Sequence, residues 1–300
     1  MKMGRTIRFG LIYFFAFVVA SSDAQTQFGD RTYGPGNLVI KEESYFSKPI
    51  QIIDMPTASI LRGGSFRAGT RIYEQGGLLA SLSAGVSNKV MFGVSYGGLD
   101  IIGDAQNITW NPMPGVHFVY RITEESMKLP AIILGFDSQG YGPYYPESSS
   151  IAPIDSSCEC APPATPPPPY NKDMFDRYQF KSRGFYCVVS KGYASFINAG
   201  LHAGVSYSLD KGEGESTAPT IFMSSDLHVV SDLAFLIEYD FALNDSKIYS
   251  RGILNMGIRW AFGRNMFFDF DVQNALGTAD GGKTDMRRTI KLTYYGSIIR

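Results

Sequence analysis

The chain has 300 residues, of which 18% are charged and 14% aromatic, with 32 glycines and a formal net charge of −1. A net charge so close to zero offers no basic surface for nucleic acid, so we expect no nucleic-acid partner. Low charge with many aromatic residues and glycines is typical of β-rich proteins that face lipid, although soluble sandwiches share this composition. No run of about 18 apolar residues follows the N-terminal region, so we expect no helical membrane span there.

Residues 1–24 have the features of a secretory signal peptide. Three basic residues precede a short apolar segment, Phe9–Ala20. The small-x-small sequence at 22–24 predicts cleavage after Ala24, with residues 18–20 as a second choice. A single N-terminal anchor helix is the alternative, but the apolar run is short for a bilayer.

Residues 25–62 differ from the rest of the chain, because only Asn37–Ile40 and Ile50–Ile53 look strand-like among glycine and proline punctuation. We interpret this stretch as an N-terminal extension that enters or seals the periplasmic mouth of a barrel. A loose periplasmic leader is the alternative.

From residue 63 onward, large apolar residues alternate with small or charged ones. A period of two predicts strands with two unlike faces, and charges spread along whole strands suit a barrel with lipid outside and a polar lumen. The clearest alternation covers Leu233–Asn244 and Leu254–Phe262. The full set of predicted strands is Phe66–Tyr73, Leu78–Val86, Val90–Tyr96, Val116–Thr123, Leu129–Gly140, Asp176–Lys191, Ile197–Leu209, Thr217–Val230, Leu233–Asn244, Leu254–Phe262, Met266–Asn274 and Arg287–Ile298.

The lengths of the connections give an independent test of this architecture. With a periplasmic N-terminus, even-to-odd connections should be short turns and odd-to-even ones should be longer outer loops. The predicted strands follow this rule except at Gly76-Gly77, and the longest outer loop is the Pro-rich segment 141–175, in which we expect no strand. The sequence therefore predicts an all-β, transmembrane, antiparallel up-and-down barrel of about twelve strands over residues 63–300. A soluble sandwich has no reason to sort its loops in this way.

The three cysteines carry little chemistry. Cys158 and Cys160 lie in the Pro-rich loop and Cys187 lies on a predicted strand. Two sulfurs without nearby histidine make a weak metal site, and a disulfide in an exported chain has no decidable pairing. We expect no metal, no cofactor and no catalytic thiol.

The polar face of the predicted strands defines a set of lumen-lining residues. These charges avoid hydrocarbon by facing water or one another, so they form either a salt-bridged interior or a selective pore with a basic and an acidic wall. The predicted lumen residues are Arg67, Arg71, His117, Arg121, Lys181, Arg183, His202, Glu238, Asp240, Arg259, Asp269, Asp271 and Lys291.

A catalytic site is less well supported. His202 has Ser206 and Ser208 on its own strand face, but successive residues on one face are nearly 7 Å apart, so they do not form a triad with it. Asp269 and Asp271 could bind a cation or act as an acid/base pair, yet such pairs more often bind a neighbouring Arg or Lys. We predict that the protein is not an enzyme.

The segment 54–58 (Asp-Met-Pro-Thr-Ala), followed by Gly63–Phe66, resembles poorly characterised bacterial envelope proteins. Its Met-Pro-Thr-Ala part is similar to the opening of the YjbH family, outer-membrane proteins associated with exopolysaccharide production. Phe92–Gly98 and Leu134–Gly142 likewise resemble poorly characterised bacterial envelope proteins. The resemblance implies an outer-membrane barrel and a link to polysaccharide export; it brings no catalytic residues.

Taken together, the sequence favours an outer-membrane channel or export accessory for small solutes or polysaccharide. Its expected partners are outer-membrane lipid and the barrel assembly machinery. Two alternatives stay open: a closed structural or adhesive barrel that binds a partner through its outer loops, and an outer-membrane hydrolase.

Overall fold

The computed structural model describes residues 48–298, apart from 105–106, 127, 146–175, 195–197, 211–217, 247–248, 264 and 278–285. The predicted signal peptide, most of the predicted extension, Cys158 and Cys160 lie outside these residues. Cys187 is half-buried and forms no disulfide within the described part of the chain. In the described part of the chain, no helix is long and apolar enough to cross a membrane.

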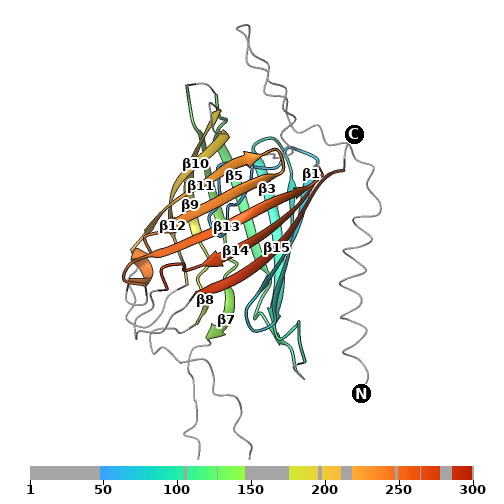
Figure 1. Cartoon of the computed structure of the whole chain (residues 1–300), viewed down its shortest axis with the longest axis vertical. Helices are drawn as coiled ribbons and strands as arrows, with labels where there is room; N and C mark the ends of the chain where they lie inside the picture. Colours follow the sequence, from blue (N-terminus) through green and yellow to red (C-terminus); the bar gives the residue numbers. More distant parts are fainter. Residues whose placement is uncertain are drawn as a thin grey trace, which may run out of the picture.

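Twelve antiparallel strands form one closed barrel (Figure 1). The strand β1 closes the cylinder, because it pairs with both β2 and β15. Closure removes the open sheet edge that lipid could not satisfy, and the predicted up-and-down barrel is confirmed. The barrel strands are β1 (Ser65–Tyr73), β2 (Gly77–Gly85), β3 (Val90–Leu99), β5 (Gly115–Thr123), β6 (Ala131–Asp137), β9 (Gly184–Ala194), β10 (Asn198–Tyr207), β11 (Thr220–Val230), β12 (Leu233–Asp240), β13 (Ile253–Phe262), β14 (Met266–Gln273) and β15 (Arg287–Ser297).

The outer face of the barrel is apolar. Phe92, Phe118, Phe235 and Trp260 are each about 45% exposed, whereas Glu238, which belongs to the same strand as Phe235, is 1% exposed. A soluble protein rarely exposes a contiguous apolar surface of this extent, so the outer face fits lipid. The alternation read from the sequence therefore places apolar residues outside and most charges inside.

The connections are sorted by length between the two ends of the barrel, except for the short β1–β2 turn at 74–76. The end with short turns also holds the start of β1 and the end of β15, where Ser65 pairs with Ser297. The long connections at the opposite end contain four short elements (Figure 1). They are β4 (Thr109–Trp110), β7 (Tyr141–Tyr145), β8 (Arg177–Phe180) and the 3₁₀ turn η1 (Leu243–Asp245).

Two expectations about the longest connection are wrong. The predicted single strand Asp176–Lys191 is two strands, β8 and β9, because the chain breaks at residues 181–183 and Gly184 takes a left-handed φ of 59°. The segment 141–175 does contain a strand, because β7 occupies its start and pairs with β8 in a separate two-stranded sheet. Residues 146–175 lie outside the described part.

Candidate functional site: the barrel lumen

Residues 48–62 run into the barrel and back again, and we name this segment the luminal hairpin. Lys48 pairs with Glu125 at the short-turn end, and Gly63 donates to the Asn88 side chain at the same end. Between these points the Ile52 amide donates to the Met55 carbonyl and the Thr57 amide to the Ile50 carbonyl, which closes a tight turn. Ile52 and Ile53 are fully buried at its tip. The strand-like stretch Ile50–Ile53 is thus part of this turn and contributes one isolated bridge, Gln51 to Pro56.

A buried carboxylate holds the tip of the luminal hairpin. The Glu238 carboxylate, on β12, accepts hydrogen bonds of 2.9–3.0 Å from three successive backbone amides, those of Ile53, Asp54 and Met55. It also accepts a hydrogen bond of 2.7 Å from the side-chain amide of Asn255. Three converging N–H groups form a nest for an anion, and here the barrel wall supplies that anion.

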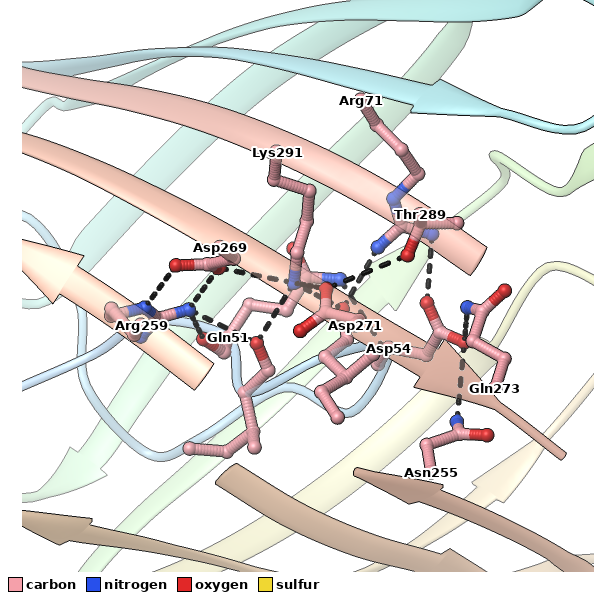
Figure 2. A network of polar contacts seen from close by, with 12 residues as sticks. Gln51, Asp54, Arg71, Asn255, Arg259, Asp269, Asp271, Gln273, Thr289 and Lys291 are labelled. Carbon is pink, nitrogen blue, oxygen red and sulfur yellow. Dashed lines mark hydrogen bonds and ion pairs between the residues drawn. The ribbon is translucent and has the colours of Figure 1, made fainter. Parts of the chain in front are cut away.

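The carbonyl groups of the same turn face cations on the neighbouring strands (Figure 2). Arg71 donates to the Ile53 carbonyl at 2.8 Å, and Lys291 donates to the Ile52 and Ile53 carbonyls at 3.1 Å. Arg259 donates to the carbonyls of Gln51 and Ile52, also at 3.1 Å. The tip therefore has its backbone donors on an acid and its backbone acceptors on bases, which satisfies polar groups that would otherwise be buried unpaired.

The side chain of Asp54 joins the hairpin to the long-loop end. Its carboxylate lies 2.7 Å from Arg71 and accepts from Tyr141 and Gln273 at 2.6 Å. Tyr141 belongs to β7, within the predicted outer loop. The hairpin thus reaches from the short turns at one end of the lumen to a long-loop strand at the other.

Below the tip, apolar side chains pack around the returning arm of the hairpin. Met55, Ala58, Ile60 and Leu61 form one buried cluster with inward-facing residues from eight barrel strands. Those barrel residues are Met91, Val119, Ala131, Ile133, Tyr186, Val188, Phe222, Ala261, Phe267 and Tyr295. Part of the lumen face is therefore apolar, which the expectation of a uniformly small or charged inner face missed.

The two predicted carboxylates on β14 lie among bases. Asp269 pairs with Arg259 at 2.7 Å and with Lys291 at 3.2 Å, and Asp271 pairs with Lys291 at 2.9 Å. These ion pairs fix the heads of the two bases that bind the hairpin carbonyls. A salt-bridged interior describes this wall, which combines acids and bases instead of separating them.

The long-loop end carries a second ionic cluster. Asp245 accepts from Arg177 at 2.8 Å and lies 3.0 Å from Lys181, while Arg183 pairs with Asp240 at 2.7 Å. Burial alone would raise the pKa of Asp245, but the charges of Arg177 and Lys181 hold it below its ordinary value. These contacts tie the β7–β8 sheet to the η1 turn.

Three strands contribute a chain of polar contacts around the predicted lumen histidine. His202 Nδ1 lies 2.8 Å from Ser190 Oγ, and its Nε2 lies 2.8 Å from Asp226. The other oxygen of Asp226 lies 2.7 Å from His228 Nε2. The Ala58 amide of the hairpin donates to the same Ser190 hydroxyl at 2.7 Å, so the chain also holds the returning arm. Among the described residues, no three His, Cys, Asp or Glu side chains are arranged to bind a metal ion.

A polar cavity of about 170 Å³ remains beside the hairpin. On the barrel side it is bordered by a region that we name the open wall, formed by β1, β2, β3 and β5. Its cavity-lining residues include Arg71, Leu79, Met91 and Val119, but a patch of mostly small residues lies among them. The patch consists of Arg67, Gly69, Ser81, Ser83, Gly93, Ser95 and His117.

The structure brings most of the predicted lumen residues into two groups. Arg71, Glu238, Arg259, Asp269, Asp271 and Lys291 surround the hairpin tip, and Arg67, His117, Lys181, Arg183 and Asp240 line the cavity. His202 belongs to the polar chain at Ala58. Arg121 stands apart near the short turns, paired with Glu124.

Sequence reasoning missed several partners of these groups. Asp54, Asn255, Gln273 and Tyr141 complete the contacts at the tip, and Ser190 and Asp226 complete those of His202. Asn255 and Gln273 share the inward alternation of Arg259 and Asp269, so the period of two was a usable signal. The position of Ser190 was also available, because an antiparallel turn between β9 and β10 places it opposite His202.

A closed antiparallel barrel with an apolar outer face and a polar, partly filled lumen defines the class of transmembrane β-barrels. Among solved structures, the chain is similar to the KdgM porin, at 10% identity and a TM-score of 0.41 over 77% of this chain and 98% of that one. It is similar to the NanC porin at 11% identity and a TM-score of 0.37, over 78% and 99%. It is also similar to the Acinetobacter baumannii outer membrane protein Omp33, at 10% and 0.38 over 78% and 96%. No protein-family model and no curated protein matches the chain.

Proposed function

We propose that this protein is a channel of the bacterial outer membrane for small polar solutes, with the luminal hairpin acting as a plug that narrows the passage. The observation that carries the proposal is the polar cavity beside the hairpin, inside a closed barrel with an apolar outer face. A polar passage in an apolar shell is what a small solute needs to cross lipid. The periplasmic end is then the one with the short turns.

Planar-bilayer recording on the purified full chain tests this function. Heat-modifiable migration on a gel first verifies that the barrel is folded. We then expect discrete current steps in simple salt, with a conductance below that of a variant whose hairpin has been removed. A folded barrel that carries no current in either form would contradict the channel.

The strongest rival is a closed structural or adhesive barrel. The contacts of the hairpin tip and the β7–β8 sheet over the long-loop end both favour it, because they fill the lumen from two sides. Such a barrel carries no current with its hairpin in place. Binding through its outer loops would persist when the open wall is altered, which separates it from a channel.

A hydrolase is a second candidate, favoured by the geometry of Ser190, His202 and Asp226. In that role Ser190 Oγ would attack an acyl carbonyl carbon and pass its proton to His202, which would give it to the leaving oxygen before water releases the acyl group. Against this role, the Ala58 amide occupies the hydroxyl. Labelling with a fluorophosphonate probe tests it: label on the full chain that is lost in Ser190→Ala but kept in Ser206→Ala would establish a reactive serine.

The link to polysaccharide export that the YjbH-type resemblance implies stays a proposal with a structural condition. A cavity of about 170 Å³ beside the hairpin has no room for a polymer chain. Export of a polysaccharide therefore requires the hairpin to leave the lumen, whereas a small solute requires only the cavity.

A further inference from the structure

A row of paired residues crosses the open wall at one level of the barrel. Arg67 on β1 pairs with Ser83 on β2, Ser83 pairs with Gly93 on β3, and Gly93 pairs with His117 on β5. Directly paired residues of an antiparallel sheet point to the same face, so this whole row faces the lumen. Arg67, Ser83 and His117 all line the cavity.

The polar groups of this row have no partners within the described part of the chain. Arg67 makes no ion pair there and its buried Nε has no hydrogen bond, while the other cations around the hairpin tip and the long-loop cluster are paired with carboxylates. The Ser83 side chain is also without a partner, although the residue is only 2% exposed. A buried hydroxyl and a buried guanidinium nitrogen without partners carry a desolvation cost that a bound anion would remove.

Two glycines let these side chains pack closely on the open wall. A side-chain carbon at Gly69 would lie 2.9 Å from Ser81 Oγ and 3.7 Å from Arg67 Nη2, and the Ser81 hydroxyl donates to the Gly69 carbonyl at 3.3 Å. A carbon at Gly93 would lie 2.8 Å from Ser83 Oγ and 2.2 Å from His117 Cε1, so the imidazole fills the space that a side chain at this position would take. The two glycines therefore keep the guanidinium, the two hydroxyls and the imidazole together at the edge of the cavity.

We infer that the open wall holds a binding site for the carboxylate of a small hydroxylated acid, with Arg67 as its main donor and Ser81, Ser83 and His117 around it. A single unpaired guanidinium matches one negative charge, and its fork suits the two oxygens of a carboxylate. The inference rests on the proposed channel function, because the site lies on the wall of the same passage. It names the class of solute that the passage would select.

The neighbouring strand sets a limit to the site. His117 pairs with Asp137 on β6, whose carboxylate also lines the cavity. A bound carboxylate would be repelled by this charge. Neutralising Asp137 should therefore strengthen the binding of an anion, whereas it would leave a neutral solute unaffected.

Isothermal titration of the full chain in detergent micelles, with gluconate as the probe, tests the site. Sorbitol is the matched neutral probe, since it differs by an alcohol in place of the carboxylate. We expect gluconate to bind at least about tenfold more tightly than sorbitol, and Arg67→Gln to remove that preference. Arg67→Lys should keep part of it, because lysine retains the charge and loses the fork.

Three further variants separate a built site from the general field of the lumen. Arg121→Gln removes one positive charge from the same wall near the short turns and should leave the affinity unchanged. Gly69→Ala crowds the Ser81 hydroxyl without a change of charge and should weaken binding several-fold. Asp137→Asn should strengthen binding about two- to threefold.

Equal losses in Arg67→Gln and Arg121→Gln, or equal affinities for gluconate and sorbitol, would overturn the inference. The same samples in planar bilayers keep the two proposals apart. Current without gluconate preference contradicts the site alone, and Arg67-dependent binding without any current contradicts the channel alone.

Discussion

Two regions of the barrel lining, each of four strands, face the luminal hairpin differently. The region formed by β12–β15, which we name the clasp wall, presents long charged and amide side chains that bind the turn of the hairpin (Figure 2). The open wall includes a patch of glycines and serines and borders the cavity. Backbone pairing is continuous through both regions, so the difference between them lies in the size and charge of their side chains.

This difference shows how one barrel can hold a plug firmly and still keep a cavity beside it. A plug that contacted every strand equally would seal the lumen, and a plug that contacted none would be lost to entropy. Polar contacts hold the tip mainly from the clasp wall, while the returning arm packs against apolar residues that include Met91 and Val119 of the open wall. The cavity beside the hairpin is left for solute. We expect each wall to respond to mutation in its own way.

Removal of the hairpin should have the largest effect on this contrast. A variant in which residues 48–62 are replaced by a Gly/Ser segment of the same length loses the contacts with Glu238, Arg71 and Lys291. We expect its single-channel conductance to rise several-fold, because the lumen of a twelve-stranded barrel is then open. The measurement is planar-bilayer recording on protein with the heat-modifiable migration of the parent. An unchanged conductance would mean that the hairpin does not limit the passage.

The next largest effect is expected at the centre of the clasp wall. Glu238→Ala removes the acceptor of three buried backbone amides, at a cost of about 3 kcal/mol in the stability of the bound hairpin. Glu238→Gln keeps a carbonyl acceptor and should cost about a third of that. Limited proteolysis that follows cleavage within residues 48–62 measures the release. Equal protection in both variants and the parent would show that other contacts suffice.

The sequence predicted the barrel much better than it predicted the difference between the clasp wall and the open wall. A period of two is imposed on every strand by lipid on one side, so strand positions and the inward set, Glu238 and Asp269 included, could be predicted. The sorting of loops followed from topology in the same way. Both features are local or repeated along the chain, so they can be recognised in a single sequence.

The contacts of the clasp wall depend instead on how far the luminal hairpin enters the barrel. No local sequence pattern predicts that the backbone amides of residues 53–55 donate to Glu238, or that Tyr141 of an outer loop donates to Asp54. Such contacts join residues more than 80 positions apart, as at Asp54 and Tyr141. The apolar cluster around Leu61 could not be predicted for the same reason, because inward-facing apolar residues are explained only by their packing against the hairpin.

The open wall should respond to size. Ser81→Leu places a large side chain in the cavity and leaves the residues of the clasp wall unchanged. We expect the conductance of the full chain to fall to about half. Leu82→Ala, one residue along and on the lipid face, is the matched control and should leave the current unchanged. If Ser81→Leu behaves like its control, solute does not pass along this wall.

The smallest effect is expected at the long-loop end, where an ionic cluster ties the β7–β8 sheet to the η1 turn. The charges of Arg177 and Lys181 lower the pKa of Asp245 against the opposing effect of burial, so the folded arrangement favours the ionised form of Asp245. Its stabilisation, about 1 kcal/mol, is present above the ordinary aspartate pKa and is lost as the pH falls through the lowered value. Near-UV circular dichroism of the tyrosines in β7 and β8 between pH 6 and 2 should report this loss. Asp245→Asn should abolish the transition, whereas a transition that survives in this variant would assign it to another acid.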